Sequence, residues 1–305
     1  MSTQTTGRER LALGVGLALV VVWATAFTIQ KQVYQAMSAS GFLFARYLFV
    51  PLCAAVLLCI RHGLVWPRFS RQDAGALLAA AVVGQVLHVG LVTFGIHRST
   101  AFSSALILAC GPVFTLLVLR ILGREQWGVR QLLGVGMALA GVLIFLSDKW
   151  LHADWSGTTG DLMLLASAAL FSIYSVQSKS VFERLGSLEA MCYSTLMAAP
   201  FTVLLNLHAV HEVAWQALPP LIWLGFAWVS LGVAFGGWML WGWVSVVRGV
   251  SRTAPLMYLM PPVAGLFAWA VSGEAFGPAK LAGAGLALAG VVVAQHQGRG
   301  SQDAA

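Results

Sequence analysis

His88 is a polar, titratable residue near the middle of a long apolar run in this 305-residue sequence. It lies about fourteen residues, or roughly 20 Å along a helix, from the start of that run, and Gln85 precedes it by one helical turn. An imidazole and a carboxamide can both donate and accept hydrogen bonds. At this depth such groups are either hydrogen-bonded within the protein or placed to contact a ligand, and the imidazole can also act as a pH-sensitive switch.

Aromatic residues occur at related positions of the sequence. Trp238 follows His88 by 150 positions, with Trp241 on the same helical face three residues later. Such residues can pack a core, or they can line a cavity and offer flat apolar area and an indole donor. Tyr258 lies just before two consecutive prolines, whose missing amide donors leave backbone carbonyls free. The same two interpretations, core or cavity wall, apply to five residues on matching faces of two further segments: Trp23, Phe27, Phe171, Tyr174 and Ser175.

Three basic residues, Lys31, Arg46 and Lys179, lie within or beside apolar runs. Long basic side chains near the end of a membrane helix commonly extend to the interface. The alternative is that they attract the carboxylate of a ligand or take part in gating. The acidic residues of the predicted helices all lie near helix ends, so His88 is the only titratable candidate for proton coupling near the middle.

The composition places the chain in a lipid bilayer. Hydrophobic residues make up 59% of it, charged residues only 10%, and the mean hydropathy is +0.81. A soluble domain carries about a quarter charged residues, so this chain cannot cover a water-facing surface. The net charge of +7 suggests nucleic-acid binding, but the basic residues stand singly or in pairs between apolar runs. We therefore expect the lipid bilayer, and no nucleic acid, as a partner.

Ten apolar segments are long enough to cross a membrane, since a crossing helix needs about 20 residues. Thirteen of the 18 Lys and Arg residues fall on the side that holds both termini, four fall on the other side, and Arg46 falls inside the second segment. Basic residues accumulate on the cytoplasmic side, so both termini should be cytoplasmic. The predicted segments are residues 11–32, 42–60, 75–96, 101–121, 130–147, 161–182, 190–208, 221–246, 254–272 and 280–296.

The sequence repeats itself after about 148–150 positions. WATAFTIQK, which begins at Trp23, aligns with FSIYSVQSK, which begins at Phe171, and the pentapeptide ALAGV occurs at 138–142 and 287–291. Residues 1–150 and 151–305 then hold five helices each, so the second half must run through the membrane in the opposite direction. The predicted fold is an all-α membrane protein with ten transmembrane helices in two inverted five-helix repeats around a central cavity. The repeat also argues against a competing interpretation, in which the first segment is a cleaved secretory signal.

The two repeat halves resemble a known family. GPVFTLLVLRILGREQWGVRQLLGVGMALAGVLIF and its counterpart PPVAGLFAWAVSGEAFGPAKLAGAGLALAGVVVA are similar to the halves of the EamA-type drug/metabolite transporter superfamily, and WATAF and FARY resemble its first- and second-helix motifs. The aromatic content is most like that of YddG-type exporters of aromatic and neutral amino acids. This resemblance implies export of amino acids or similar metabolites from the bacterial cytoplasm through the inner membrane, without ATP hydrolysis.

Other classes of site are poorly supported. The four cysteines lie inside apolar runs without a CxxC pair, and HEVAW, which begins at His211, lacks the second histidine of a zinc protease motif. We therefore expect no enzyme activity, metal or cofactor. Gly136 with Ala140, and Gly285 with Ala289, should allow close helix packing or else a dimer contact, so a monomer or weak homodimer is expected. Other transported substrates (a nucleotide sugar or a cationic drug), a receptor and a membrane-embedded enzyme remain as alternatives.

Overall fold

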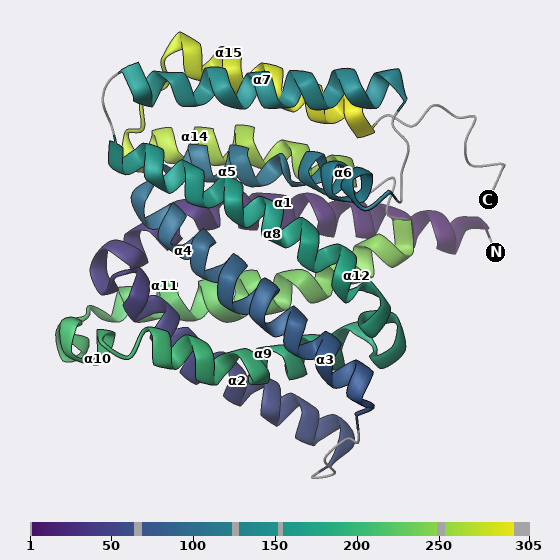
Figure 1. Ribbon diagram of the computed structural model, residues 1–305, viewed down its shortest axis with the longest axis vertical. Coiled ribbons are helices and arrows are strands. Elements are labelled where there is room, and N and C mark those ends of the chain that lie inside the picture. Colours follow the sequence, from purple (N-terminus) through teal and green to yellow (C-terminus); the bar gives the residue numbers. More distant parts are fainter. Residues whose placement is uncertain (1, 64–68, 124–127, 152–154, 249–253, 296–305) are drawn as a thin grey trace.

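The structure is a computed structural model that describes residues 2–63, 69–123, 128–151, 155–248 and 254–295. Within these ranges the side chains of 2–6, 148–151, 187, 235, 238, 239, 242, 245, 246, 254, 255 and 295 are also outside the description, Trp238 among them. The described chain folds into helices and their short connections (Figure 1).

The first half of the chain contains five helical stretches, two of which are interrupted. The third stretch contains the π-helical segment η1, through which the helix continues without a gap. The fourth stretch is broken at Cys110, shortly before Pro112. The elements are α1 (Ser2–Met37), α2 (Ala39–His62), α3 (Arg71–Ala80), η1 (Ala81–His88), α4 (Val89–Arg98), α5 (Ala101–Ala109), α6 (Gly111–Ile121) and α7 (Val129–Leu151).

The second half follows the same order, with two short helices added in one connection. Its elements are α8 (Trp155–Leu185), α9 (Ser187–Leu205), α10 (Ala209–Glu212), η2 (Trp215–Ala217), α11 (Pro220–Ala227), η3 (Trp228–Gly236), α12 (Gly237–Arg248), η4 (Ala254–Leu259), α14 (Met260–Ser272) and α15 (Pro278–Gln295). Among the described residues, seven helices are long and apolar enough to cross a membrane, and three further apolar helices are shorter. Each predicted segment overlaps one of these ten helical stretches.

Polar side chains cap several helix starts and keep the connections short. Ser70 Oγ accepts a hydrogen bond from the Asp73 N–H at 3.0 Å, and Thr100 Oγ1 accepts one from the Ser103 N–H at 3.1 Å. Ser38 alone separates α1 from α2, and it has a positive φ of 62°, which is uncommon for a residue other than glycine and marks the sharp reversal of the chain. Its hydroxyl caps α2 by accepting from the Gly41 N–H.

A π-helical segment interrupts the third helical stretch of each half. η1 holds Gln85 and His88, and η3 lies at nearly the same position after a shift of 150 residues. π-helical turns widen a helix locally and occur frequently at functional sites. These segments therefore mark the part of the bundle in which a site is expected.

The helices α7 and α15 form a separate layer at one side of the bundle (Figure 1). A Cβ atom added to Gly134 would overlap the backbone of Ala294, and one added to Gly290 would overlap the backbone of Ala138. The close packing predicted for Gly136 and Gly285 is wrong, because both glycines face open space. Gly134, which does make a close contact, lies two residues before Gly136 on α7. Two residues along a helix correspond to a rotation of about 200°, so the prediction chose the wrong face of the helix.

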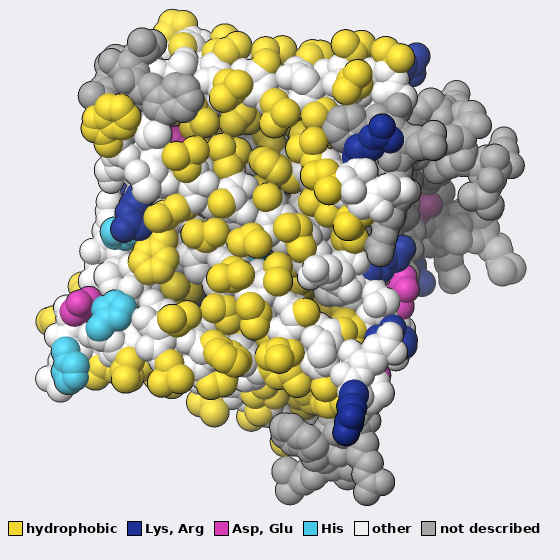
Figure 2. Space-filling model, in the orientation of Figure 1, with side chains coloured by type: hydrophobic (Ala, Val, Ile, Leu, Met, Phe, Trp, Pro, Cys, Tyr) yellow, Lys and Arg dark blue, Asp and Glu magenta, His cyan; other side chains and the backbone are white. Residues whose placement is uncertain are grey.

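The two ends of the bundle differ in charge. We call them the Lys31 end, where α1 and α4 finish and α8 begins, and the Lys179 end, where α1 begins and α8 and α15 finish. Figure 2 shows most visible Lys and Arg side chains at the Lys179 end, with apolar side chains covering the surface between the ends. The Lys179 end carries these basic residues among those described: Arg8, Arg10, Arg61, Arg71, Arg120, Arg130, Lys179, Arg184 and Arg248. The Lys31 end carries Lys31, Arg98 and Lys280.

Candidate functional site

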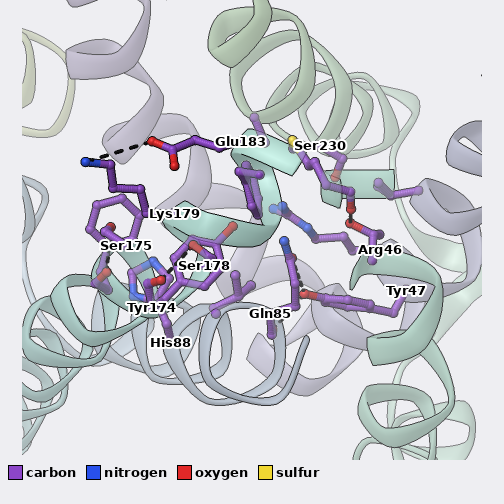
Figure 3. Close-up of a pocket in the computed structure, with 18 residues that line it drawn as sticks. Arg46, Tyr47, Gln85, His88, Tyr174, Ser175, Ser178, Lys179, Glu183 and Ser230 are labelled. Carbon is purple, nitrogen blue, oxygen red and sulfur yellow. Dashed lines mark hydrogen bonds and ion pairs between the residues drawn. The ribbon is translucent and has the colours of Figure 1, made fainter. Parts of the chain in front are cut away.

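A cavity of about 500 Å³ lies between α2, η1, α8, α9 and η3. Side chains from both halves of the chain line it, so each half builds one side of the same space (Figure 3). The lining residues are Arg46, Tyr47, Val50, Gly84, Gln85, His88, Val89, Phe171, Tyr174, Ser175, Ser178, Lys179, Phe182, Glu183, Met191, Thr195, Ser230 and Ala234.

Gln85 is held in place by Tyr47. The Tyr47 hydroxyl lies 2.7 Å from the Gln85 carbonyl oxygen and 3.0 Å from Gln85 Oε1, so the side chain of Tyr47 donates to oxygens of this one residue. With Oε1 engaged, the amide nitrogen of Gln85 points into the cavity (Figure 3). Gln85 can therefore present hydrogen-bond donors to a bound molecule.

His88 is oriented by the backbone of α8. Its Nδ1 lies 2.9 Å from the carbonyl oxygen of Ser167, and since a carbonyl can only accept, Nδ1 carries the proton. In the neutral ring Nε2 is then the acceptor. The imidazole and the Phe171 ring have centroids 5.1 Å apart, and Phe171 and Tyr174 follow at 6.0 Å. Gly84 makes room for this wall, because a Cβ at that position would overlap the Tyr174 ring.

Arg46 brings a positive charge into the cavity. Its side chain extends between the residues of η1 and η3 toward the centre of the space (Figure 3). Among the described residues no salt bridge joins Arg46 to a carboxylate. Ser230 lies on the same side of the cavity, and its buried hydroxyl has no hydrogen-bond partner among the described residues. A cation in an apolar setting that lacks a partner carboxylate favours an anionic ligand group.

The mouth of the cavity lies at the Lys179 end. Lys179 Nζ and Glu183 Oε1 are 3.9 Å apart, and their side chains are 75% and 66% exposed. Both residues line the cavity and also reach solvent, so the space is open at this end.

The Lys31 end is closed by a polar network that includes the buried residues Ser99 and Asp161. Lys31 Nζ donates a hydrogen bond to the carbonyl oxygen of Ser99, and the Ser99 hydroxyl donates to Asp161 Oδ1. Asp161 is fully buried. These contacts, which we call the Lys31–Ser99–Asp161 network, join α1, the α4–α5 connection and α8.

Two glycines bring α4 and α8 together beside this network. A Cβ on Gly95 would lie 2.7 Å from the Leu164 side chain, and one on Gly160 would lie 2.7 Å from the Ser99 backbone nitrogen. Only the absence of side chains at these positions allows the helices to approach so closely. The bundle is therefore sealed where the polar network lies.

The structure brings together seven of the thirteen residues predicted for the site. Of the others, Trp23 and Phe27 are buried in the core at 7% exposure, away from the described lining of the cavity. The Trp23 indole donates to the Val233 carbonyl at 3.0 Å, and its ring lies 5.3 Å from that of Trp241. The residues that do line the cavity are Arg46, Gln85, His88, Phe171, Tyr174, Ser175 and Lys179.

The remaining predicted residues lie elsewhere or outside the description. Tyr258 is half-buried against the core, and its hydroxyl has no partner among the described residues. Lys31 belongs to the network at the closed end. The side chain of Trp238 is outside the described residues.

Sequence reasoning missed several cavity residues. Tyr47, Ser178, Thr195 and Ser230 all line the space. Ser178 and Phe182 continue the face of α8 that carries Phe171, Tyr174 and Ser175 at spacings of three and four residues. That spacing is visible in the sequence and would have found them, whereas Ser230 is distinguished only by the π-helical segment that holds it.

The described residues contain no group of three His, Cys, Asp or Glu side chains that could hold a metal ion. The lining of the cavity offers hydrogen-bonding groups, aromatic surface and a central cation.

Comparisons with known proteins agree with this architecture. The model of the EamA-like transporter family matches residues 10–147 and again residues 158–294. The chain is 26% identical over 275 residues to a probable terminal-alkyne amino-acid exporter of Streptantibioticus cattleyicolor, covering 90% of each chain. It is 23% identical over 290 residues to an S-adenosylmethionine/S-adenosylhomocysteine transporter of Chlamydia trachomatis, covering 90% of this chain and 86% of that one.

A solved crystal structure, described only as that of a protein, superposes with a TM-score of 0.60 at 19% identity. The match covers 94% of this chain and 97% of the other, which supports the fold alone. Both of these named relatives are transporters and not enzymes. The long apolar helices make this chain a multi-pass membrane protein. With two family matches that together span most of its length, the chain belongs to the EamA-like transporter family.

Proposed function

We propose that this protein is a secondary transporter that exports neutral amino acids, aromatic ones among them, across the bacterial inner membrane by alternating access. Arg46 carries the proposal, because its guanidinium enters the cavity without a partner carboxylate among the described residues. A carboxylate is the planar anion that a guanidinium binds with two parallel hydrogen bonds. The α-carboxylate of an amino acid is the natural ligand for this position.

The remainder of the cavity suits the remainder of such a substrate. The volume of about 500 Å³ lies within the range of about 300–1,000 Å³ that is typical of small-molecule sites. Phe171, Tyr174 and Phe182 offer apolar and aromatic area to a side chain, and an aromatic contact contributes about 0.5–1.5 kcal/mol beyond burial. Gln85 and His88 add hydrogen-bonding groups. Broad specificity and weak affinity follow, since few groups select one side chain.

The relatives support an amino acid substrate over the alternatives. One is named for an alkyne amino acid and the other for S-adenosylmethionine, which itself contains an α-amino acid group. A cationic drug would face repulsion from Arg46. A nucleotide sugar would bring a diphosphate to a cavity whose only other cation, among the described lining residues, is Lys179 at the mouth.

We also propose that the ten helical stretches cross the membrane as two inverted halves, residues 1–150 and 151–305, with both termini cytoplasmic. Support comes from the seven long and three shorter apolar helices, the two family matches and the basic residues at the Lys179 end. A periplasm-active reporter fused after Arg299 should then be inactive, and one inserted near Asp154 should be active. The opposite pattern would reverse the orientation.

With this orientation the cavity opens to the cytoplasm, and the Lys31–Ser99–Asp161 network closes the periplasmic end. Lys31 would act in gating, as would Lys179 at the opposite end. Trp23, Phe27, Trp238, Trp241 and Tyr258 remain proposed substrate contacts of the state that opens at the Lys31 end. Phe27 lies one helical turn before Lys31 on the same face of α1, so that opening would expose it first.

Counterflow of labelled amino acids into proteoliposomes that hold the purified protein tests the proposal. Labelled leucine and phenylalanine should accumulate when unlabelled leucine is inside. Accumulation of a nucleotide sugar or a cationic drug, with no amino acid transported, would replace the substrate assignment. A pH gradient should either have no effect or have an effect that His88→Gln abolishes, because His88 is the titratable candidate in the cavity interior.

A further inference from the structure

A second pocket, of about 430 Å³, lies at the Lys31 end. It is formed by the last turns of α1, the first turn of α5 and the residues at the end of α14. None of its described lining residues lines the main cavity, so the two spaces are separate in this state. Its lining is markedly polar and includes Thr28, Gln32 and Gln35.

This pocket contains both a cation and an anion. Lys31 lines it from α1, and Glu274 lines it from the residue pair that follows α14. The main cavity differs, because its carboxylate Glu183 lies exposed at the mouth beside Lys179, and its central cation Arg46 has no salt bridge among the described residues. Opposite charges on two walls of one small space match the two charges of a zwitterion.

Two polar atoms of this lining have unused hydrogen-bonding capacity. Thr28 Oγ1 and Glu274 Oε1 are both buried, and neither has a partner among the described residues. From the described residues, the other carboxylate oxygen of Glu274 receives a single long contact of 3.5 Å, from the Phe102 N–H. A buried acceptor without a donor is costly, and a bound donor would remove that cost. An ammonium group donates three hydrogen bonds and suits both oxygens.

We propose that this pocket is a second amino acid site, from which the exported substrate leaves the protein; the inference rests on the proposed function. The α-carboxylate binds Lys31, the α-ammonium binds Glu274 and Thr28, and the amides of Gln32 and Gln35 face the ligand. Since Lys31 also donates to the Ser99 carbonyl, a bound carboxylate competes with the Lys31–Ser99–Asp161 network. An amino acid in this pocket therefore favours opening of the Lys31 end.

Protection of engineered cysteines tests the site in the full-length protein. In a variant that lacks Cys53, Cys59, Cys110 and Cys192, Gln35→Cys reports on this pocket and Ser175→Cys reports on the main cavity. Labelling by a small aqueous thiol reagent is measured against L-leucine concentration. Leucine should protect Gln35→Cys, whereas 4-methylpentanoate, which lacks the ammonium group, and 3-methylbutylamine, which lacks the carboxylate, should not.

Glu274→Gln should raise the half-protecting leucine concentration at Gln35→Cys by about tenfold or more, because it removes a charge-assisted hydrogen bond. Protection at Ser175→Cys should stay unchanged, which also shows that the variant is folded. Thr28→Val removes one acceptor without a change in charge and should give a smaller rise, of about threefold. Glu212→Gln is the matched control, because Glu212 is an exposed carboxylate at the same end and should have no effect.

The two reporters separate the possible failures. If leucine protects Ser175→Cys and not Gln35→Cys, the second site is absent and the proposed function stands. If it protects Gln35→Cys alone, the second site stands and the main-cavity assignment fails. Equal protection of Gln35→Cys with and without Glu274→Gln, or protection by 4-methylpentanoate, would also overturn the second site.

Discussion

Lys31 and Lys179 occupy matching positions of the two repeats, 148 residues apart, yet their surroundings differ. Lys31 donates a hydrogen bond to the carbonyl oxygen of Ser99, in the connection between α4 and α5. The Ser99 hydroxyl in turn donates to the fully buried Asp161. Lys179 pairs at 3.9 Å with Glu183, one turn away on its own helix, and both side chains are largely exposed. Within the part of the chain that the structure describes, Lys31 therefore joins separate helices, and the ion pair of Lys179 stays within one helix.

This difference explains which end of the bundle is closed. The Lys31–Ser99–Asp161 network and the close contact at Gly95 and Gly160 hold α4 against α8 at the Lys31 end. An exposed pair such as Lys179–Glu183 contributes only about 0.2–1 kcal/mol, and it makes no contact that would draw helices together. The repeat thus supplies two similar ends, and a few residues outside the repeated pattern make one of them the closed end.

The largest effect on transport is expected from substitution of Arg46, the cation in the main cavity between the two ends. Arg46→Gln should lower kcat/KM for leucine counterflow by about 100-fold, because loss of one partner of a buried charge pair costs about 2–5 kcal/mol. Arg46→Lys should recover part of the activity. Arg120→Gln removes an exposed charge outside the cavity lining and should leave kcat/KM for leucine counterflow unchanged. Normal transport by Arg46→Gln would show that the carboxylate binds elsewhere.

Asp161→Asn should open the closed end. A hydrogen bond to a charged group contributes about 1.5–3 kcal/mol, so its weakening should raise the labelling rate of Phe27→Cys by about tenfold. Phe27 is the reporter because it is buried in this state and lies one turn from Lys31. A labelling rate that does not change would mean that the network has no part in closure.

Gly160→Ala should give a smaller rise in Phe27→Cys labelling, of about fivefold. The new methyl group would lie 2.7 Å from the Ser99 nitrogen and would push α4 and α8 apart, at a cost of about 1–3 kcal/mol. Gly136→Ala is the control, since Gly136 faces open space. If both variants label alike, close contact between α4 and α8 does not hold this end closed.

Glu183→Gln should have the smallest effect, with less than a threefold change in Phe27→Cys labelling. It neutralises a carboxylate as Asp161→Asn does, but the affected ion pair is exposed and confined to one helix. The two variants therefore compare the same chemical change at the two ends. Equal effects would contradict the difference between Lys31 and Lys179.

Much of the fold could be predicted from the sequence because apolar length and a repeat are local or periodic signals. Each of the ten predicted segments overlaps a helical stretch, and Gln85, His88 and the Phe171–Ser175 face line the cavity. These residues share the property that a polar or aromatic face continues along a single helix. Arg46 could also be found from the sequence, because a charged residue stands out within an apolar run.

The closed end could not be predicted in the same way. Ser99 and Asp161 are 62 residues apart, and nothing in either segment indicates the other. Trp23 shows a second limit, because the rotation of a helix is set by its neighbours. An indole that donates to the Val233 carbonyl across the two halves gives the same sequence pattern as an indole that faces a cavity.

The proposed cytoplasmic opening of the main cavity is tested most directly by measuring the side of the membrane from which a reagent can reach it. Ser175→Cys, in a variant without the four native cysteines, should be labelled by a membrane-impermeant thiol reagent in inside-out vesicles and not in right-side-out vesicles. L-leucine should slow that labelling. Labelling of Ser175→Cys only from the periplasmic face would contradict the proposed cytoplasmic opening of the cavity.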